Sequence, residues 1–181
     1  MTQILLLYAH PTPRGSYLNR YLADRVEEIP SLHLRDLYQL YPDFYIDTAE
    51  EQRHLREADL VLMQFPIRWF SVPAILREWQ DNVLTKGFAF GPGGTALRGK
   101  RFSAIVTTGA QASSYETNQP HGAPIEAYLA PVMQTASFCG MQVEPAFVLH
   151  GARDLDGAER AEACDQYLDY IRRLAAGGAH D

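Results

Sequence analysis

A tyrosine and a histidine that could do chemistry follow an apolar run in the middle of the chain. Tyr115 and His121 lie in the segment TTGAQASSYETNQPHG, which spans residues 107–122. A phenol donates a hydrogen bond, and an imidazole titrates near neutral pH. The pair could therefore stabilise negative charge or move a proton in a reaction. The alternative is an ordinary loop, in which the histidine is solvated and the tyrosine contributes to packing.

Two other segments could form a ligand site together with this one. HPTPRGSYLN, residues 10–19, contains turn residues, a serine hydroxyl and the start of a predicted helix. Such a segment could bind a phosphate, or it could be a plain loop whose serine caps the helix. In residues 65–83, Trp69 and Phe70 lie between two prolines. They could form an apolar wall for a planar ligand, or they could complete the core or an oligomer interface.

Alternating strands and helices are expected to position these segments. The apolar runs predict strands over residues 3–9, 32–37, 59–65, 101–109 and 143–151. Helical periodicity predicts helices over residues 16–29, 48–58, 73–84, 123–140 and 156–175, with Ser16 and Thr48 as N-caps. Residues 38–47 are expected to be irregular, and residues 85–100 form a glycine-rich excursion. The pattern predicts a parallel α/β sheet, for which the flavodoxin-like order 2-1-3-4-5 is one common solution. That order brings the ends of strands 1, 3 and 4 to one edge.

Length and composition predict the number of domains and argue against several classes of function. The 181 residues predict one domain, residues 1–176, followed by a frayed tail, residues 177–181. A net charge of -6 without a basic run argues against general nucleic-acid binding. Two cysteines without ligand spacing indicate a reducing cytosol, no disulfide framework and no metal. No apolar window approaches the ~18 residues of a membrane span, and the start is not a signal peptide, so no direct membrane insertion is expected.

Several long motifs carry a resemblance to a known family. They are YAHPTPRGSYLN, LYPDFYID, FPIRWFSVPAILREWQDNV, GFAFGPGGTALRGK and TTGAQASSY. On these motifs the chain resembles the flavodoxin-like NAD(P)H:quinone oxidoreductases. It is most similar to the small bacterial members that act as ancillary proteins of glutathione-gated potassium efflux (Kef) systems. The resemblance implies a flavodoxin-like three-layer sandwich, a homodimer and a bound flavin. FMN is the expected flavin, although related members hold FAD, and NAD(P)H is the implied co-substrate.

The resemblance also implies which residues form the site. It assigns the flavin phosphate end to His10, Ser16, Tyr17, Leu18 and Asn19, the ring to Pro66, Ile67, Arg68, Trp69 and Phe70, and the polar edge of the ring to Thr107, Thr108, Gly109, Ala110 and Tyr115. In the larger animal quinone reductases, a loop of the form TTGG-x4-Y-x5-H carries a tyrosine and a histidine that serve hydride transfer. Tyr115 and His121 have the same spacing here and are implied to be catalytic.

Two positions depart from the family pattern. Ala110 replaces a second glycine, and Arg68 replaces an uncharged residue. Arg68 could contact the phosphates of the nicotinamide cofactor or point to solvent. The Kef ancillary proteins also vary around the position of Tyr115, which leaves its necessity open.

The resemblance leaves three functions to compare. In the first, NAD(P)H reduces the flavin, and a quinone or another electrophile then takes two electrons in a ping-pong cycle. In the second, the chain is a regulatory subunit that docks on a Kef-type potassium transporter at the inner face of the membrane and is otherwise cytoplasmic. The third is a one-electron carrier, against which the Tyr115–His121 pair and the excursion argue. A related fold that has lost its flavin is the remaining alternative.

Overall fold

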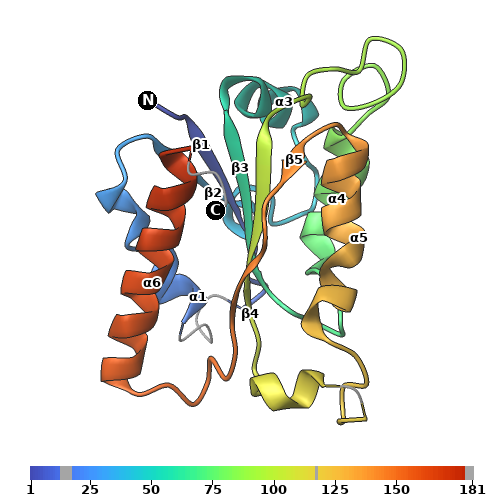
Figure 1. Ribbon diagram of the computed structural model, residues 1–181. Coiled ribbons are helices and arrows are strands. Elements are labelled where there is room, and N and C mark those ends of the chain that lie inside the picture. Colours follow the sequence, from blue (N-terminus) through green and yellow to red (C-terminus); the bar gives the residue numbers. More distant parts are fainter. Residues whose placement is uncertain (13–17, 117, 178–181) are drawn as a thin grey trace.

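The computed structural model of this chain describes residues 1–12, 18–116 and 118–177. At its centre lies a parallel sheet whose order is β2-β1-β3-β4-β5, with β6 also paired to β4 (Figure 1). The strands are β1 (Ile4–Tyr8), β2 (Leu32–Asp36), β3 (Leu60–Pro66), β4 (Arg101–Thr107), β5 (Gln142–Val143) and β6 (Phe147–Leu149). The expected fold class and strand order are confirmed.

Helices cover both faces of this sheet. The helices α1 (Asn19–Ala23) and α6 (Gly157–Ala175) lie on one face, and α3 (Thr48–Glu57), α4 (Ala74–Val83) and α5 (Ile125–Phe138) lie on the other (Figure 1). Successive residues of β1 point to opposite faces, so Leu5 and Leu7 pack with one layer while Ile4 and Leu6 pack with the other. The result is the three-layer sandwich that the sequence predicts. None of the helices in the described ranges is long and apolar enough to cross a bilayer.

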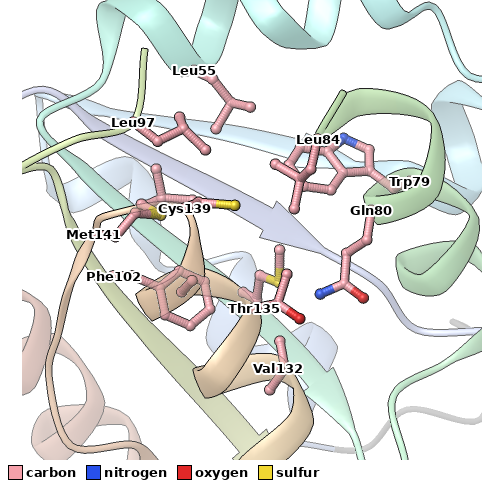
Figure 2. Close-up of a pocket in the computed structure, with 13 residues that line it drawn as sticks. Leu55, Trp79, Gln80, Leu84, Leu97, Phe102, Val132, Thr135, Cys139 and Met141 are labelled. Atoms are coloured by element: carbon pink, nitrogen blue, oxygen red, sulfur yellow. The ribbon is translucent and has the colours of Figure 1, made fainter. Parts of the chain in front are cut away.

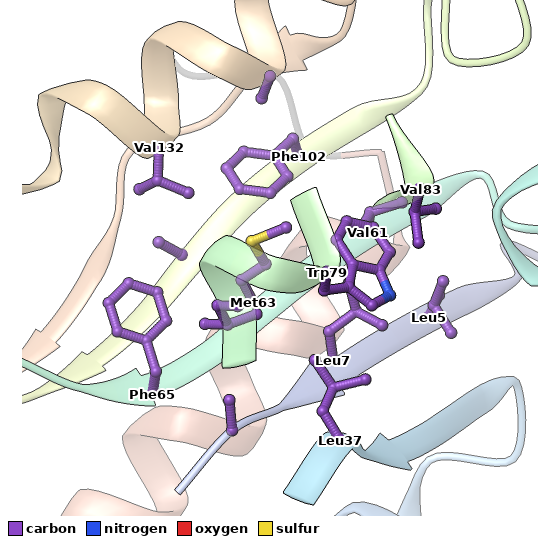
Figure 3. Packing of buried hydrophobic residues seen from close by; sticks show 14 of the residues in the cluster. Leu5, Leu7, Leu37, Val61, Met63, Phe65, Trp79, Val83, Phe102 and Val132 are labelled. Carbon is purple, nitrogen blue, oxygen red and sulfur yellow. The ribbon is translucent and has the colours of Figure 1, made fainter. Parts of the chain in front are cut away.

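The larger core lies between the sheet and the layer of α3, α4 and α5. Leu5, Val61 and Met63 reach from neighbouring strands toward Trp79 of α4 (Figure 3). A small hollow within this layer is lined almost wholly by apolar side chains, among them Trp79 and Phe102 (Figure 2). It contains none of the predicted site residues and is a packing feature of the core. Cys139 belongs to this core and Cys164 to the core on the other face, so the two thiols are separated by the sheet.

Two predicted elements are shorter than expected. The helix over residues 16–29 is reduced to α1 and a 3-10 turn, η2 (Val26–Glu28), in the described part of the chain. Pro30 disfavours a helical conformation at Ile29, which is extended with φ of -112°. The fifth strand is divided into β5 and β6, because Pro145 has no N–H to continue the ladder. The Pro145 carbonyl accepts hydrogen bonds from the hydroxyl groups of Ser103 and Tyr170.

Two local details also differ from the sequence prediction. Asp47, rather than Thr48, caps α3, since its carboxylate accepts from the backbone N–H of Glu50 at 3.0 Å. The segment expected to be irregular begins inside a short helix, α2 (Leu37–Leu40), which is capped by Asp36. The excursion over residues 85–100 lies at the amino ends of the strands, directly before β4 begins (Figure 1).

Candidate functional site

A cleft opens at the carboxyl ends of the strands. Its lining residues come from four segments, which follow β1, β3, β4 and β6: His10, Thr12, Leu18, Asn19, Pro66, Ile67, Arg68, Thr107, Thr108, Gly109, Ala152 and Arg153. The structure thus brings the three segments singled out in the sequence to one place. Nine of the predicted residues line the cleft, and Thr12, Ala152 and Arg153 were not predicted.

The cleft carries positive charge. Arg68 and Arg153 line it, and none of its described lining residues is acidic. His10 adds no charge at neutral pH, because burial and the nearby Arg68 lower its pKa from 6.5 to about 4. Its Nδ1 accepts a hydrogen bond from the Thr12 N–H at 3.2 Å. Arg68 is exposed and also lines the cleft, so a contact with cofactor phosphates and an orientation toward solvent both stay predictions. Such a cleft suits an anionic ligand.

A buried polar network holds the floor of the cleft in place. The Asn19 side-chain amide donates to the Thr107 hydroxyl, and its Oδ1 accepts from Gln64 Nε2 at 3.1 Å. Gln64 Nε2 also donates to the Asn19 carbonyl at 3.0 Å, and Gln64 Oε1 accepts from the Tyr167 hydroxyl at 2.8 Å. Asn19, Gln64 and Thr107 are all buried. Asn19 therefore ties the segment after β1 to β3 and β4, which gives its side chain a positioning role.

The segment after β3 contains a strained turn. Arg68 and Ser71 exchange two backbone hydrogen bonds of 2.9 and 3.0 Å. Between them, Trp69 and Phe70 have φ of 50° and 59°, the left-handed pair of a type I′ turn. Such turns normally use asparagine and glycine, and a left-handed residue with a side chain costs roughly 1–2 kcal/mol. Trp69 is 93 % exposed, which excludes the core alternative for that ring. A ligand wall or an interface between copies remains for Trp69.

The predicted catalytic pair meets in an aromatic cluster beside the cleft. Tyr115 lies in the 3-10 helix η3 (Ala112–Tyr115), and its ring centroid is 4.6 Å from that of His121. His121 also lies 5.4 Å from Phe70, which links the cluster to the strained turn. Neither Tyr115 nor His121 is among the residues that line the cleft. The structure brings the two together, in contact with Phe70 and outside the lining of the cleft.

The surroundings of Tyr115 keep its phenol protonated. Burial raises the pKa of the Tyr115 phenol, and a hydrogen bond with Thr108 offsets part of that effect. The phenol is therefore a neutral donor near pH 7. In the described part of the chain, the buried Nδ1 of His121 has no hydrogen-bond partner. An unsatisfied imidazole nitrogen beside a phenol is available to a ligand or to a proton.

A fourth segment, residues 149–153, completes the cleft and escaped the sequence analysis. Thr108 N donates to the Leu149 carbonyl, Ala152 N to the Thr108 carbonyl and Gly151 N to the Ala110 carbonyl, each at 2.9 Å. The Thr108 hydroxyl also lies 3.0 Å from His150 Nδ1. Gly151 has φ of 63°, and a Cβ there would lie 2.4 Å from Gln111 Nε2. Gly151, the last residue of the last predicted strand, was the available signal, because that strand ends at the same edge of the sheet.

The remaining predicted residues fall into two groups. Ser16 and Tyr17 lie outside the described residues. Trp69, Phe70 and Ala110 are described but do not line the cleft. The Ala110 carbonyl accepts from Gly151 N at 2.9 Å and from the Thr108 hydroxyl at 2.7 Å, so it fixes the segment after β6. Among the residues that the structure describes, no cluster of three His, Cys, Asp or Glu side chains is arranged to hold a metal ion.

Comparison with known proteins identifies the family. A family model described as a flavodoxin-like fold matches residues 2–174. The chain belongs to this flavodoxin-like family. One relative is the glutathione-regulated potassium-efflux system ancillary protein KefF of Klebsiella aerogenes, which is 44 % identical over 147 residues. That alignment covers 81 % of this chain and 82 % of KefF. The resemblance drawn from the sequence motifs is confirmed.

Solved structures of similar proteins agree with this flavodoxin-like assignment. General stress protein 14 of Treponema denticola, in complex with FMN, is 33 % identical with a TM-score of 0.87, and the match covers 96 % of this chain and 98 % of that one. An NADPH-quinone reductase from P. pentosaceus is 25 % identical with a TM-score of 0.84, covering 93 % and 96 %. A protein described as a thermophilic tryptophan halogenase from Streptomycin violaceusniger is 39 % identical with a TM-score of 0.89, covering 92 % and 97 %.

Proposed function

We propose that this chain is a flavin-dependent NAD(P)H:quinone oxidoreductase whose cleft binds FMN, with FAD as the alternative. The observation that carries the proposal is the cleft at the carboxyl ends of the strands, which has two guanidinium groups and no described acidic lining residue. FMN combines a phosphate with a planar ring, and so suits such a site beside a turn of two aromatic residues. The FMN complex of general stress protein 14 and the quinone reductase supply the analogy for cofactor and reaction.

Each segment of the cleft has a role in this proposal. His10 and the segment up to Asn19 hold the phosphate end, residues 66–70 lie along the ring, and residues 107–110 lie along its polar edge. Bound flavin would take a hydride from NAD(P)H and pass two electrons to a quinone or another electrophile. Tyr115 and His121 lie beside the cleft, and the family resemblance assigns them their roles. Tyr115 would donate a hydrogen bond toward the negative charge that hydride transfer brings, and His121 would exchange a proton. Arg68 adds a positive charge where the phosphates of the nicotinamide cofactor could enter.

The test is an absorbance spectrum of the purified protein, followed by anaerobic NADPH and then a soluble quinone. Flavin bands that bleach with NADPH and return with quinone are expected, and chromatography of the released flavin distinguishes FMN from FAD. Parallel-line initial-rate kinetics would indicate a ping-pong cycle. A colourless protein that takes up no added FMN or FAD would overturn the cofactor assignment.

A homodimer is part of the proposal. The excursion over residues 85–100 lies at the amino ends of the strands (Figure 1). The residues that line the cleft lie at the carboxyl ends of the strands. The excursion therefore cannot line the cleft of its own copy, but that of a second copy could complete it. This arrangement follows the family resemblance, in which the excursion helps to form a dimeric pocket. The fully exposed Trp69 beside the cleft is compatible with such an interface.

A regulatory role is the second candidate, and the 44 % identity with KefF favours it. In this role the chain docks on the inner face of a Kef-type potassium transporter and activates it, with the reductase activity separate. Family membership alone does not select the reaction, because a halogenase is described among proteins of the same fold. Potassium efflux in cells that carry the transporter, measured with the unmodified chain and with Tyr115→Phe, separates the roles. Efflux that needs the chain but not Tyr115 would support regulation independent of turnover.

A further inference from the structure

We propose that Arg153 supplies a positive charge that binds the two-electron-reduced flavin more tightly than the oxidised flavin, and so raises the reduction potential. This inference rests on the proposed function, in which Gly109 lies along the polar edge of the flavin ring. Arg153 lies outside the motifs that carry the family resemblance.

The side chain of Arg153 lies against Gly109. A Cβ placed on Gly109 would be 3.6 Å from Nε and 3.8 Å from Cζ of Arg153. Both residues line the cleft, although one follows β4 and the other follows β6. Arg68 lies by His10, whose pKa it lowers. The guanidinium that meets the 107–110 segment is that of Arg153.

The backbone beside Arg153 is well anchored. Its neighbour Ala152 donates to the Thr108 carbonyl, and Gly151 donates to the Ala110 carbonyl, each at 2.9 Å. A further bond of 2.9 Å from Asp154 N to the Gly151 carbonyl closes a turn around Arg153. The polar edge of the cleft and the backbone that carries Arg153 are therefore parts of one hydrogen-bonded unit, while the Arg153 side chain itself is exposed. A backbone that is positioned before reaction reduces the reorganisation that the charge needs during it.

The charge of Arg153 is not neutralised by a neighbour in the described ranges, where none of the ion pairs includes it. The adjacent Asp154 carboxylate accepts instead from Gln111 Nε2 at 3.2 Å. In the proposed reaction, NAD(P)H gives up a hydride and becomes NAD(P)+, and the transferred electron pair leaves one additional negative charge on the flavin. A cation at the polar edge favours that reduced form. The charge is released when a quinone takes the hydride and a proton from solvent to become a hydroquinone.

The experiment measures affinity in both redox states. Flavin-free protein is titrated with oxidised FMN, and anaerobically with dithionite-reduced FMN, for the unmodified chain and for Arg153→Gln. Arg153→Lys keeps the charge. Arg173→Gln, on the surface of α6, makes the same change away from the cleft. Because both titrations measure binding alone, the readout does not depend on turnover.

We expect Arg153→Gln to weaken the binding of reduced FMN roughly tenfold more than that of oxidised FMN. For a two-electron couple, this tenfold difference corresponds to a fall in midpoint potential of about 30 mV. Arg153→Lys and Arg173→Gln should keep the ratio of the unmodified chain. Equal weakening of both states, or no change in either, would overturn the inference while leaving the proposed function intact. If the unmodified chain bound neither form of FMN, the proposed function would fail and the inference with it.

Discussion

At the scale of single residues, His10 makes the cleft sensitive to acid. Its pKa is about 4 in the folded chain, because of burial and Arg68, against an ordinary value of 6.5 when unfolded. Between these values the unfolded chain binds a proton that the folded chain excludes. The stabilisation from His10 is therefore complete above about pH 6.5 and is lost as the pH falls toward 4.

This dependence predicts a measurable titration. In the unmodified chain, NMR of the His10 ring should give a pKa near 4, and Arg68→Gln should raise it by removing a nearby positive charge. His10→Gln should flatten the decrease in unfolding free energy between pH 6.5 and 4. A His10 pKa near its ordinary value in the folded chain would contradict the environment described here.

Tyr115 and His121 are predicted to affect turnover more than binding. Tyr115→Phe removes the phenolic donor, and His121→Ala removes the unsatisfied Nδ1. Each should slow NADPH reduction of bound flavin by roughly 10²-fold, with little loss of FMN affinity. Stopped-flow absorbance measures the rate, and Tyr45→Phe, at a residue that is 83 % exposed, is the control. Rates like those of the unmodified chain would remove the pair from the reaction.

At the scale of elements, the left-handed turn of Trp69 and Phe70 should lower the stability of the free protein and contribute to FMN binding. Trp69→Gly relieves a left-handed conformation worth roughly 1–2 kcal/mol, and loses about 0.5–1 kcal/mol because glycine gives the unfolded chain more freedom. The ring is 93 % exposed, so little buried area is lost. The free energy of unfolding of the free protein should thus rise by up to about 1.5 kcal/mol in urea, while FMN binding weakens. Tyr45→Gly, at an exposed residue without a positive φ, should lower stability instead.

The buried carboxylate of Glu51 joins β2, α3 and α4. It accepts from Arg35 Nε at 2.7 Å, from the Tyr41 hydroxyl at 2.7 Å and from Trp79 Nε1 at 2.8 Å. Glu51→Gln leaves Arg35 buried without its counter-charge, and should cost about 3–5 kcal/mol of unfolding free energy. The matched change Glu57→Gln breaks a surface pair with Arg53 and should cost under about 1 kcal/mol. Equal losses in urea unfolding would contradict the central role of Glu51.

Local sequence predicted the elements well where one physical signal dominates. Apolar runs fixed the position of β1, β3 and β4, because these strands are buried on both faces. The division of the last strand at Pro145 was not predicted, although a proline removes one N–H from the ladder. The left-handed turn at Trp69 and Phe70 could not be predicted, because aromatic residues ordinarily avoid that conformation.

Part of the site was also predictable, because the local sequence carries a clear signal. The segments after β1, β3 and β4 can be recognised in the sequence by their glycine, proline and aromatic residues. The placement of Arg153 depends instead on pairing between residues 108–110 and 149–152, which are distant in sequence. Neither residue periodicity nor spacing encodes such a contact. The charge of the cleft was therefore the least predictable of its properties.

At the scale of the whole molecule, the proposed dimer makes FMN binding in the cleft of one copy depend on the excursion, residues 85–100, of the other copy. Gly94→Ala should disturb that excursion, since a Cβ there would lie 2.0 Å from the Phe90 carbonyl oxygen. Gly109→Phe should fill the cleft instead, because Gly109 lines it without a positive φ. Each variant alone should bind FMN poorly. Mixed under conditions that allow exchange, they should recover part of the binding, because each heterodimer pairs an intact cleft with an intact excursion. Sedimentation velocity would show the dimer, and a monomer that binds FMN fully, or no recovery on mixing, would confine the excursion to its own copy.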